Sequence, residues 1–578
     1  MLKYYEQYQN ELIGNKVKQQ PNNKSRPCKP KTIITQAYEL EESVIRNDFV
    51  RDRDRILHSK SFRRLEHKAQ IFSHEKGDHF RTRLTHTIEV DQIARSLCRN
   101  LGLNDDLVEA IALGHDIGHT PFGHEGERAL AAIMAGVDDL GGLIRYPIYH
   151  GGFKHNYQGL RTLDFIEGIY DQAEGLFLTW QTIDGILKHT NINNKNKTPI
   201  CDIKKFSTNA DFYFYDEESK INLLDYLHPV TLEGQIVYLA DEIAQRQHDL
   251  DDTLSDDILK ITVNEAIDII KKCMQPSVLA TIEKEIKSMA ETFSKKLDTI
   301  KKRKDENKKR RNLVSTIIEY FIIDATYQSM ENLLIMHDNE KDKFIFRGNR
   351  NCYSNRIINF SKMGEKINNA IATYINNRIV NSYDVNRFDA KAAYIVRHLF
   401  KAYYTNPRQM TDSVLRKLNC NLVDISNATG GIKVNVDGKR PNILLTNIRT
   451  GDPSHVEALL SLLKLDIDHS YSFYDSEINQ HIKEALDDNC RTGELDEYKK
   501  INLNFKGKYL KRFNYDLWIN NQEYKSKKIT FNKNKPDTIY ILLLRVNYLF
   551  LSSICDYIAG MTDNFAKEEY RKLYSIID

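Results

Sequence analysis

The stretch from Arg81 to Glu127 constrains the fold of this chain more than any other part of its sequence. Its second half, Gly114 to Glu127, places three histidines and three carboxylates among four glycines and a proline. Glycine and proline let the backbone turn sharply, so side chains that titrate or bind metals are gathered in a small space. Packing alone does not explain this density, which therefore predicts a functional site.

Helical spacing shows which way the first histidine of this stretch points. Val90 and Leu97 follow His86 at helical intervals, so His86 shares the apolar face of its helix and faces inward. Gly102 is expected to end this helix, and Asn104 to begin the next one.

The second helix carries another inward-facing histidine. Val108 and Ile111 precede His115 at helical intervals, and Asp116 follows it directly. Taken singly, each histidine is better explained as a hydrogen-bonded core residue. Two inward histidines beside a carboxylate instead favour a buried divalent metal. Asp241 also faces inward, because Val237 precedes it by one helical turn.

These residues resemble a known family. His86, His115-Asp116 and Asp241 resemble the H…HD…D metal set of the HD-domain phosphohydrolases, and the segments starting at Phe62 and Arg81 resemble its dGTPase-like, bacterial deoxynucleoside triphosphate triphosphohydrolases. The resemblance implies a mainly α fold, a multi-helix HD-domain metal-dependent phosphohydrolase core. Alternating residues in the C-terminal half add the expectation of small β-hairpins there. The resemblance also implies hydrolysis of a dNTP, with dGTP favoured, at the α-phosphorus to a deoxynucleoside and tripolyphosphate.

The resemblance assigns a role to each matching residue. The metal ligands would be His86, His115, Asp116 and Asp241, and the acid–base pair His124 and Glu127. Glu127 lies one helical turn after His124, where its carboxylate can orient the imidazole. The substrate contacts would be Gln70 and Asp249 on the sugar, and Arg83, His119, His155, Asn156 and Lys188 around the phosphates or base. One departure is Gln245, where relatives usually carry a tyrosine.

The types of ligand atom limit which metal ions the site could hold. Two imidazoles and two carboxylates suit Mn²⁺ or Mg²⁺, which are favoured here, and also Fe²⁺ or Zn²⁺. A metal with open positions activates water and polarises a phosphoryl oxygen. An imidazole beside it, for which His124 is the candidate, would then protonate the leaving 5′-oxygen.

Composition excludes several other classes of protein. The chain has 578 residues, a net charge of +3 and eight scattered cysteines without a C-x-x-C pair, which argues against a disulfide framework or a zinc ribbon. No apolar run has the length of a signal peptide or a membrane span, so we expect a cytoplasmic protein without membrane contact.

The pattern along the chain predicts five regions. They are a polar N-terminal arm (1–37), an HD catalytic core (38–255), a helical extension that completes the catalytic domain (256–420), an insertion with β-hairpins (421–545) and a C-terminal helix (546–578). The insertion is expected to be strand-rich because residues alternate around an Asp437-Gly438 turn.

Partners and alternative functions stay open at this stage. The resemblance implies a homo-oligomer, a hexamer or tetramer, and activation by a second dNTP or by single-stranded DNA. The basic run 301–311 is better explained as a solvated helix face or an inter-subunit loop than as a nucleic-acid contact. The alternatives are an HD phosphodiesterase or phosphatase that acts on another nucleotide, and a nucleotide-sensing or DNA-binding regulator with reduced activity.

Overall fold

The fold was examined in a computed structural model. It describes residues 18–19, 46–70, 81–144, 150–168, 175–193, 199–207, 209–216, 220–255, 262–275, 284–338, 345–346, 352–380, 383–411, 413–415 and 536–575. The chain forms two compact units that alternate along the sequence. The first comprises Met1–His119, His155–Ile192 and Asn209–Ala390, and the second comprises Thr120–Lys154, Asn193–Thr208 and Lys391–Asp578.

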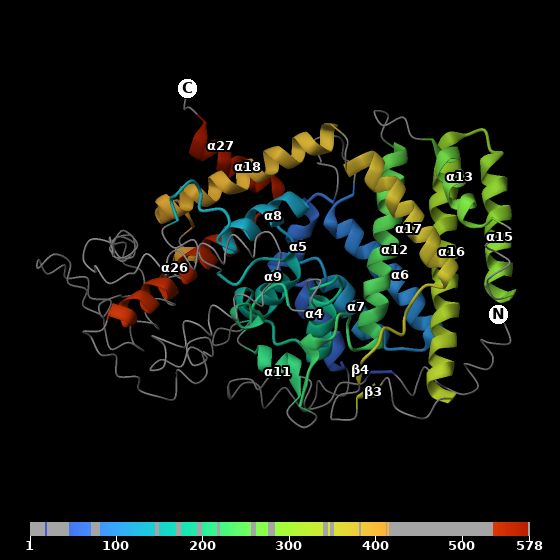
Figure 1. Ribbon diagram of the computed structural model, residues 1–578, viewed down its shortest axis with the longest axis horizontal. Helices are drawn as coiled ribbons and strands as arrows, with labels where there is room; N and C mark the ends of the chain where they lie inside the picture. The colour runs from blue at the N-terminus through green and yellow to red at the C-terminus, as the bar shows by residue number, and fades with distance from the viewer. Residues whose placement is uncertain are drawn as a thin grey trace, which may run out of the picture. The chain divides into compact units, whose positions relative to one another are not determined.

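The first unit is built from helices (Figure 1). They are α4 (Asp48–Leu57), α5 (Lys60–Arg64), α6 (Arg83–Leu101), α7 (Asp105–Gly114), α9 (His155–Arg161), α10 (Trp180–Leu187), α11 (Ala210–Phe214), α12 (Leu232–Ser255), α13 (Val263–Cys273), α15 (Lys284–Lys301), α16 (Glu306–Asp338) and α17 (Lys362–Ile375). Short 3₁₀ or π turns occupy Leu65–His67, Thr162–Ile166, Leu223–Asp225 and Asn376–Val380.

The second unit is also helical. It contains α8 (Gly123–Met134), α26 (Pro536–Ala559), α27 (Asp563–Tyr574) and 3₁₀ turns at Ile203–Lys205 and Pro407–Gln409, while α18 (Tyr383–Thr405) enters this unit at Lys391. Helix α26 packs against α8. The sequence predicted a C-terminal helical region over 546–578. In the described chain α26 begins at Pro536 and ends at Ala559, and Thr562 caps α27 by accepting a hydrogen bond from Phe565 N.

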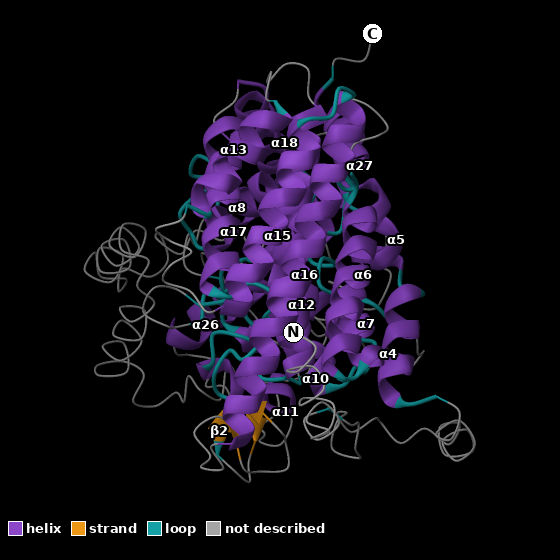
Figure 2. Cartoon of the chain, turned by 90° about the vertical axis from the view of Figure 1, so that its right-hand side faces the viewer, coloured by secondary structure: helices purple, strands orange, loops and turns teal. Residues whose placement is uncertain are grey.

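Strands are few among the described residues. β1 (Tyr215–Asp216) pairs antiparallel with β2 (Ile221–Asn222), and β3 (Ile345–Phe346) pairs with β4 (Cys352–Tyr353). Figure 2 shows purple helices through most of the described chain, joined by teal loops. The mainly α fold is confirmed, whereas the hairpins expected within 421–545 lie outside the described residues.

Local sequence explains where the central helices begin and end. Thr82 closes a capping box at the start of α6, and Gly102 ends that helix in the left-handed region at φ 66°. Asn104 accepts hydrogen bonds from the first turn of α7, and Thr231 accepts one from Gly234 N at 3.1 Å at the start of α12. The helix boundaries predicted at Gly102 and Asn104 are confirmed.

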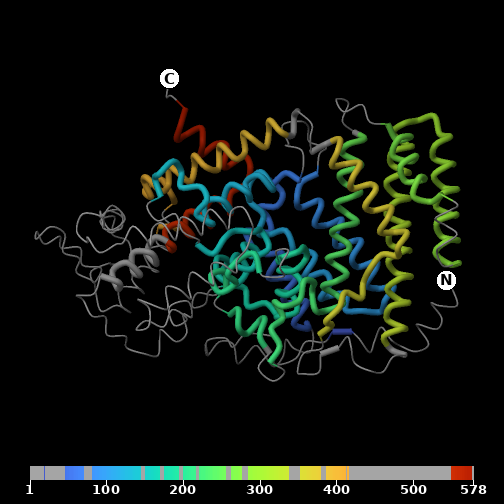
Figure 3. The backbone as a smooth tube through the Cα atoms, in the orientation of Figure 1, coloured from blue at the N-terminus to red at the C-terminus, as the bar shows by residue number. Residues whose placement is uncertain are grey.

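The core of the first unit forms where α6, α7 and α12 pack together. Helix α6 contacts both α7 and α12, and the tube in Figure 3 shows the blue α6 beside the green α12. Val90, Ile93 and Leu97 are buried on the inner face of α6. Among the described helices, none combines the length and apolar character that crossing a bilayer requires.

Candidate metal centre

His86 occupies the inner face of α6, as its spacing predicted. It is 1% exposed and lies one turn before the buried Val90. Its Nε2 atom is 3.0 Å from Oδ1 of Asp241 on α12 and 3.9 Å from Oδ2 of Asp116. The packing of α6 against α12 thus brings together residues that are far apart in the sequence.

His115 and Asp116 complete this cluster from the end of α7. The Nδ1 atom of His115 is 2.7 Å from Ala112 O, so this nitrogen carries the hydrogen and Nε2 offers a lone pair. That Nε2 atom is buried without a hydrogen-bond partner among the described residues. It lies 3.6 Å from Asp116 Oδ1 and 3.8 Å from Asp241 Oδ1.

The charges in this cluster fit a divalent cation. Burial alone would raise the pKa of the Asp116 carboxyl, but His115, His119 and Arg83 hold it well below its usual range. Burial is likewise outweighed at Asp241, where the His86 hydrogen bond and His115 lower the pKa to about 2. Both carboxylates are therefore ionised near neutrality. His86, His115 and Asp116 each offer a ligand atom within 4.8 Å of the others, in a buried position suited to a metal ion.

Arg83 lies directly against the cluster. Its Nη1 atom donates to Asp116 Oδ2 at 3.0 Å, and both side chains are buried. Its Nε atom and the Oε1 atom of Gln70 are buried without hydrogen-bond partners among the described residues. Each therefore has capacity to bind a further group.

His119 and His155 form a stacked pair beside Asp116. Their ring centroids are 3.9 Å apart, and Nε2 of His119 lies 3.0 Å from Asp116 Oδ1. Burial, Arg83 and His155 lower the pKa of His119 well below its usual range, so its ring is neutral. This pair adjoins the candidate metal ligands.

Asn156 and Lys188 have structural partners. The Asn156 amide donates to Leu187 O at 2.9 Å and to Thr190 Oγ1 at 3.0 Å, which ties α9 to the end of α10. Lys188 is fully buried, with its Nζ atom 2.7 Å from Leu223 O and 2.6 Å from Asp184 Oδ1. The ammonium group predicted to contact phosphate thus pairs with a carboxylate one helical turn earlier.

Asp249 lies two turns after Asp241 on α12. It is buried, its Oδ1 atom has no hydrogen-bond partner among the described residues, and burial raises its pKa to about 7. Gln245, between the two aspartates, is half-buried on the same helix.

Two further histidines, to which the sequence analysis assigned no role in the site, belong to this region. His248 lies 3.0 Å from His86, measured between the two Nδ1 atoms. The His189 ring centroid is 5.1 Å from that of His115 and 5.3 Å from that of His155. A usable signal existed for His248, because it follows the inward-facing Asp241 by seven residues, which is two helical turns.

The predicted acid–base pair belongs to the second unit. His124 is exposed and Glu127 half-buried, one turn apart on α8. Phe122, just before α8, has a φ of 63°, which is strained for a bulky residue. Its backbone N–H donates to Asp563 of α27 at 2.9 Å, so α27 stabilises the turn that starts α8.

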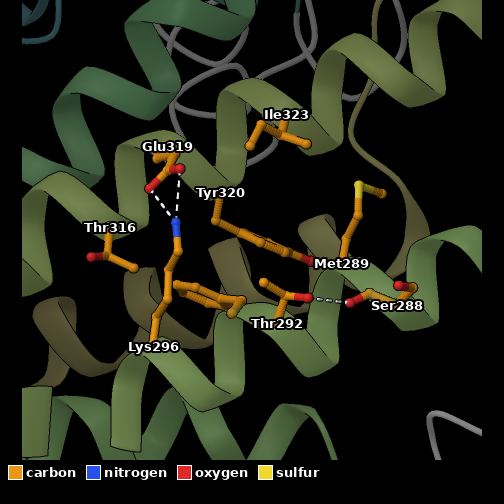
Figure 4. Close-up of a pocket in the computed structure, with 9 residues that line it drawn as sticks. Ser288, Met289, Thr292, Lys296, Thr316, Glu319, Tyr320 and Ile323 are labelled. Carbon is orange, nitrogen blue, oxygen red and sulfur yellow. Dashed lines mark hydrogen bonds and ion pairs between the residues drawn. The ribbon is translucent and has the colours of Figure 1, made fainter. Parts of the chain in front are cut away.

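A separate pocket lies between α15 and α16 (Figure 4). Phe293 and Tyr320 stack there at 4.3 Å, and Lys296 pairs with Glu319 at 2.7 Å. None of the site residues predicted from the sequence lines this pocket. The chemistry is therefore better sought at the His/Asp cluster.

Comparison with known proteins agrees with the fold and the cluster. Residues 83–246 match the HD domain, and residues 551–572 match the phosphohydrolase-associated domain. The first match contains His86, His115, Asp116 and Asp241, and the second includes Asp563. The chain thus contains an HD domain, and the candidate His/Asp metal cluster lies within the matched residues.

Curated relatives narrow the family. The chain is 36% identical to the deoxyguanosinetriphosphate triphosphohydrolase-like protein of Bartonella quintana, over 66% of this chain and 84% of the relative. Proteins of the same description from Rhizobium leguminosarum bv. trifolii and Geobacter metallireducens are 34% and 32% identical, over 66% and 64% of this chain and 83% and 80% of theirs. The chain belongs to the family of deoxyguanosinetriphosphate triphosphohydrolase-like proteins.

Proposed function

We propose that this protein is a metal-dependent dNTP triphosphohydrolase that releases a deoxynucleoside and tripolyphosphate, with dGTP as the favoured substrate. The observation that carries the proposal is that His86, Asp116 and Asp241 lie close to one another and to the buried, unpaired Nε2 atom of His115 within the described residues. The name shared by the relatives supports the substrate class.

The four ligand side chains would hold Mn²⁺ or Mg²⁺, with Fe²⁺ or Zn²⁺ also compatible with their nitrogen and oxygen atoms. When bound, the metal would lower the pKa of a coordinated water toward neutrality and polarise a phosphoryl oxygen. Ionised Asp116 and Asp241 would supply the negative charge that retains the cation, and His115 would bind it through Nε2.

The neighbouring side chains would bind the nucleotide. Arg83 brings a buried positive charge beside Asp116, which suits the triphosphate. His119 also contacts Asp116, and His155 stacks on His119. Gln70 and Asp249 each have a buried oxygen without a hydrogen-bond partner among the described residues, and these oxygens would bind hydroxyl groups of the sugar. We assign Asn156 and Lys188 positioning roles, because their polar atoms already bond to the protein.

His124 would donate the proton to the leaving 5′-oxygen, and Glu127 would orient its ring. This assignment rests on the family resemblance and on their spacing of one turn on α8.

A product analysis tests the proposal. The four dNTPs and four NTPs are incubated with the protein and Mn²⁺ or Mg²⁺, with and without a second dNTP or single-stranded DNA, and tripolyphosphate is measured. Release of tripolyphosphate from dGTP is expected. Release of orthophosphate or pyrophosphate instead would indicate another HD phosphatase or phosphodiesterase, and binding without turnover would indicate a regulator.

A further inference from the structure

The imidazole of His86 makes a contact on each of its two nitrogens. Nε2 faces Asp241 at 3.0 Å, while Nδ1 lies 3.0 Å from Nδ1 of His248 on α12. The two rings meet edge to face with centroids 5.1 Å apart, and both are buried. Two ring nitrogens at this distance can bond only if one carries a hydrogen and the other a lone pair, so the tautomers of the two histidines are coupled.

Glu89 fixes the direction of this bond. The Nε2 atom of His248 contacts the Glu89 carboxylate, which lies one turn after His86 on α6. An ionised carboxylate can only accept, so Nε2 of His248 carries its hydrogen and Nδ1 accepts from His86. Nε2 is then the His86 nitrogen left facing the cluster, where a bound metal would take the place of the hydrogen that Nε2 donates to Asp241.

Arg81 contacts the same carboxylate oxygen of Glu89 as His248 does. Its Nε atom lies 3.3 Å from Glu89 Oε2, and its Nη atoms reach Asp252 at 2.8 Å and Asp251 at 2.9 Å. Glu89 belongs to α6 and the two aspartates to α12. The network therefore joins the two helices that supply His86 and Asp241.

We propose that His248 and Glu89 are positioning residues that set the tautomer and ring orientation of the His86 ligand. Neither touches the reacting atoms in this assignment. Hydrogen-bond partners of this kind on a ligating histidine typically change metal affinity by about 10- to 100-fold. The inference rests on the proposed metal site and does not depend on which nucleotide is hydrolysed.

The test measures Mn²⁺ affinity of the metal-stripped full-length protein by calorimetry. His248→Ala is expected to weaken binding by about 10- to 100-fold, because His86 loses its partner. His248→Asn should recover most of that loss, since its Oδ1 atom lies near the position of Nδ1 and can accept from His86. Glu89→Gln should give a smaller loss, because an amide oxygen is a weaker acceptor.

A matched control is Glu109→Gln. Glu109 is a carboxylate of α7 that pairs with Arg53 and Arg95 at 3.2 Å, and its substitution should leave Mn²⁺ affinity unchanged. His86→Ala, as the reference, should abolish the site. Circular dichroism confirms folding of each variant, and if His248→Ala does not fold, the Asn and Gln variants carry the test.

Mn²⁺ affinity of folded His248→Ala within about threefold of the unsubstituted protein would overturn the proposal, as would an Asn variant no better than Ala. Unchanged binding by His86→Ala would also overturn it, because the metal would then lie elsewhere. Wild-type protein that binds Mn²⁺ through His86 but releases no tripolyphosphate would refute the proposed function and leave this inference standing.

Discussion

At the scale of single residues, metal binding and proton transfer are assigned to different side chains. His124→Ala is therefore expected to keep its metal but lose about 10²- to 10⁴-fold in turnover, the usual contribution of a general acid. His115→Ala should lose both metal and turnover, since its Nε2 atom faces the ligand carboxylates. Metal content by mass spectrometry and tripolyphosphate release measure the two effects. A fully active His124→Ala enzyme would refute the acid–base assignment.

A second residue-scale prediction concerns Asp324 on α16, which is buried away from the cluster. Burial raises its pKa to about 6 from 3.8, the ordinary value of an aspartate, although Ser361 and Tyr320 donate hydrogen bonds to it. Between these two values the unfolded chain has lost this proton while the folded chain retains it. The Asp324 contribution to the free energy of unfolding should therefore fall as pH rises from about 4 to 6, by roughly 3 kcal/mol in total.

The measurement compares urea unfolding of wild-type protein with Asp324→Asn across that pH range. The variant does not titrate at this position, so the difference in free energy of unfolding between the two proteins should change over pH 4 to 6 and stay constant above it. A constant difference throughout would show that Asp324 is ionised in the folded protein.

The sequence predicted those site residues whose placement depends on local helix geometry. His86, His115 and Asp241 were expected on inner faces because apolar residues recur around them, and all three are found together. The role of Lys188 was not predictable in full, since one of its partners, Leu223 O, is distant in sequence. Its other partner, Asp184, lies four residues earlier, and opposite charges at this spacing on a helix predict an ion pair.

At the scale of elements, two facing glycines control how closely the turn after α7 approaches α9. A Cβ atom at Gly118 would lie 2.0 Å from His155 O and 2.2 Å from Gly159 N, both backbone atoms. Gly118→Ala should therefore separate His119 from His155 and destabilise the fold by about 1–3 kcal/mol. The urea midpoint and turnover should both fall.

Gly159→Ala is the matched control for this close approach. Its new Cβ atom would meet Gly118 N at 3.5 Å, an ordinary contact. Because alanine favours a helix interior by about 1 kcal/mol over glycine, this variant should be at least as stable as wild type. Equal stability of the two alanine variants would show that the approach of the turn to α9 does not constrain the fold.

Helix ends that depend on a local cap could be predicted from the sequence, whereas a tertiary contact at such an end could not. Gly102 and Asn104 act at their own helix ends, as expected. Thr562 is likewise a local N-cap of α27, but the sequence does not show that the adjacent Asp563 accepts a hydrogen bond from Phe122 N. Such a pairing over more than four hundred residues leaves no periodic pattern.

At the scale of the whole molecule, the alternation of the two units along the chain was not predictable, because the contacts that define them join distant segments. The boundaries inferred at 37, 255, 420 and 545 follow composition and remain predictions. The family matches fall in both units, with the HD domain over 83–246 and the associated domain over 551–572.

Metal binding is expected to stabilise the folded chain as a whole, because the ligands come together only on folding. His86 and Asp241 lie on different helices, so unfolding separates the ligands and Mn²⁺ should bind the folded state almost exclusively. At a free Mn²⁺ concentration about 100-fold above its dissociation constant, this adds about 2.7 kcal/mol to the free energy of unfolding. Calorimetric scans should show a higher unfolding temperature with Mn²⁺ than with EDTA, and no such difference in Asp241→Ala. A similar rise in that variant would mean that the stabilising ion binds outside the His/Asp cluster.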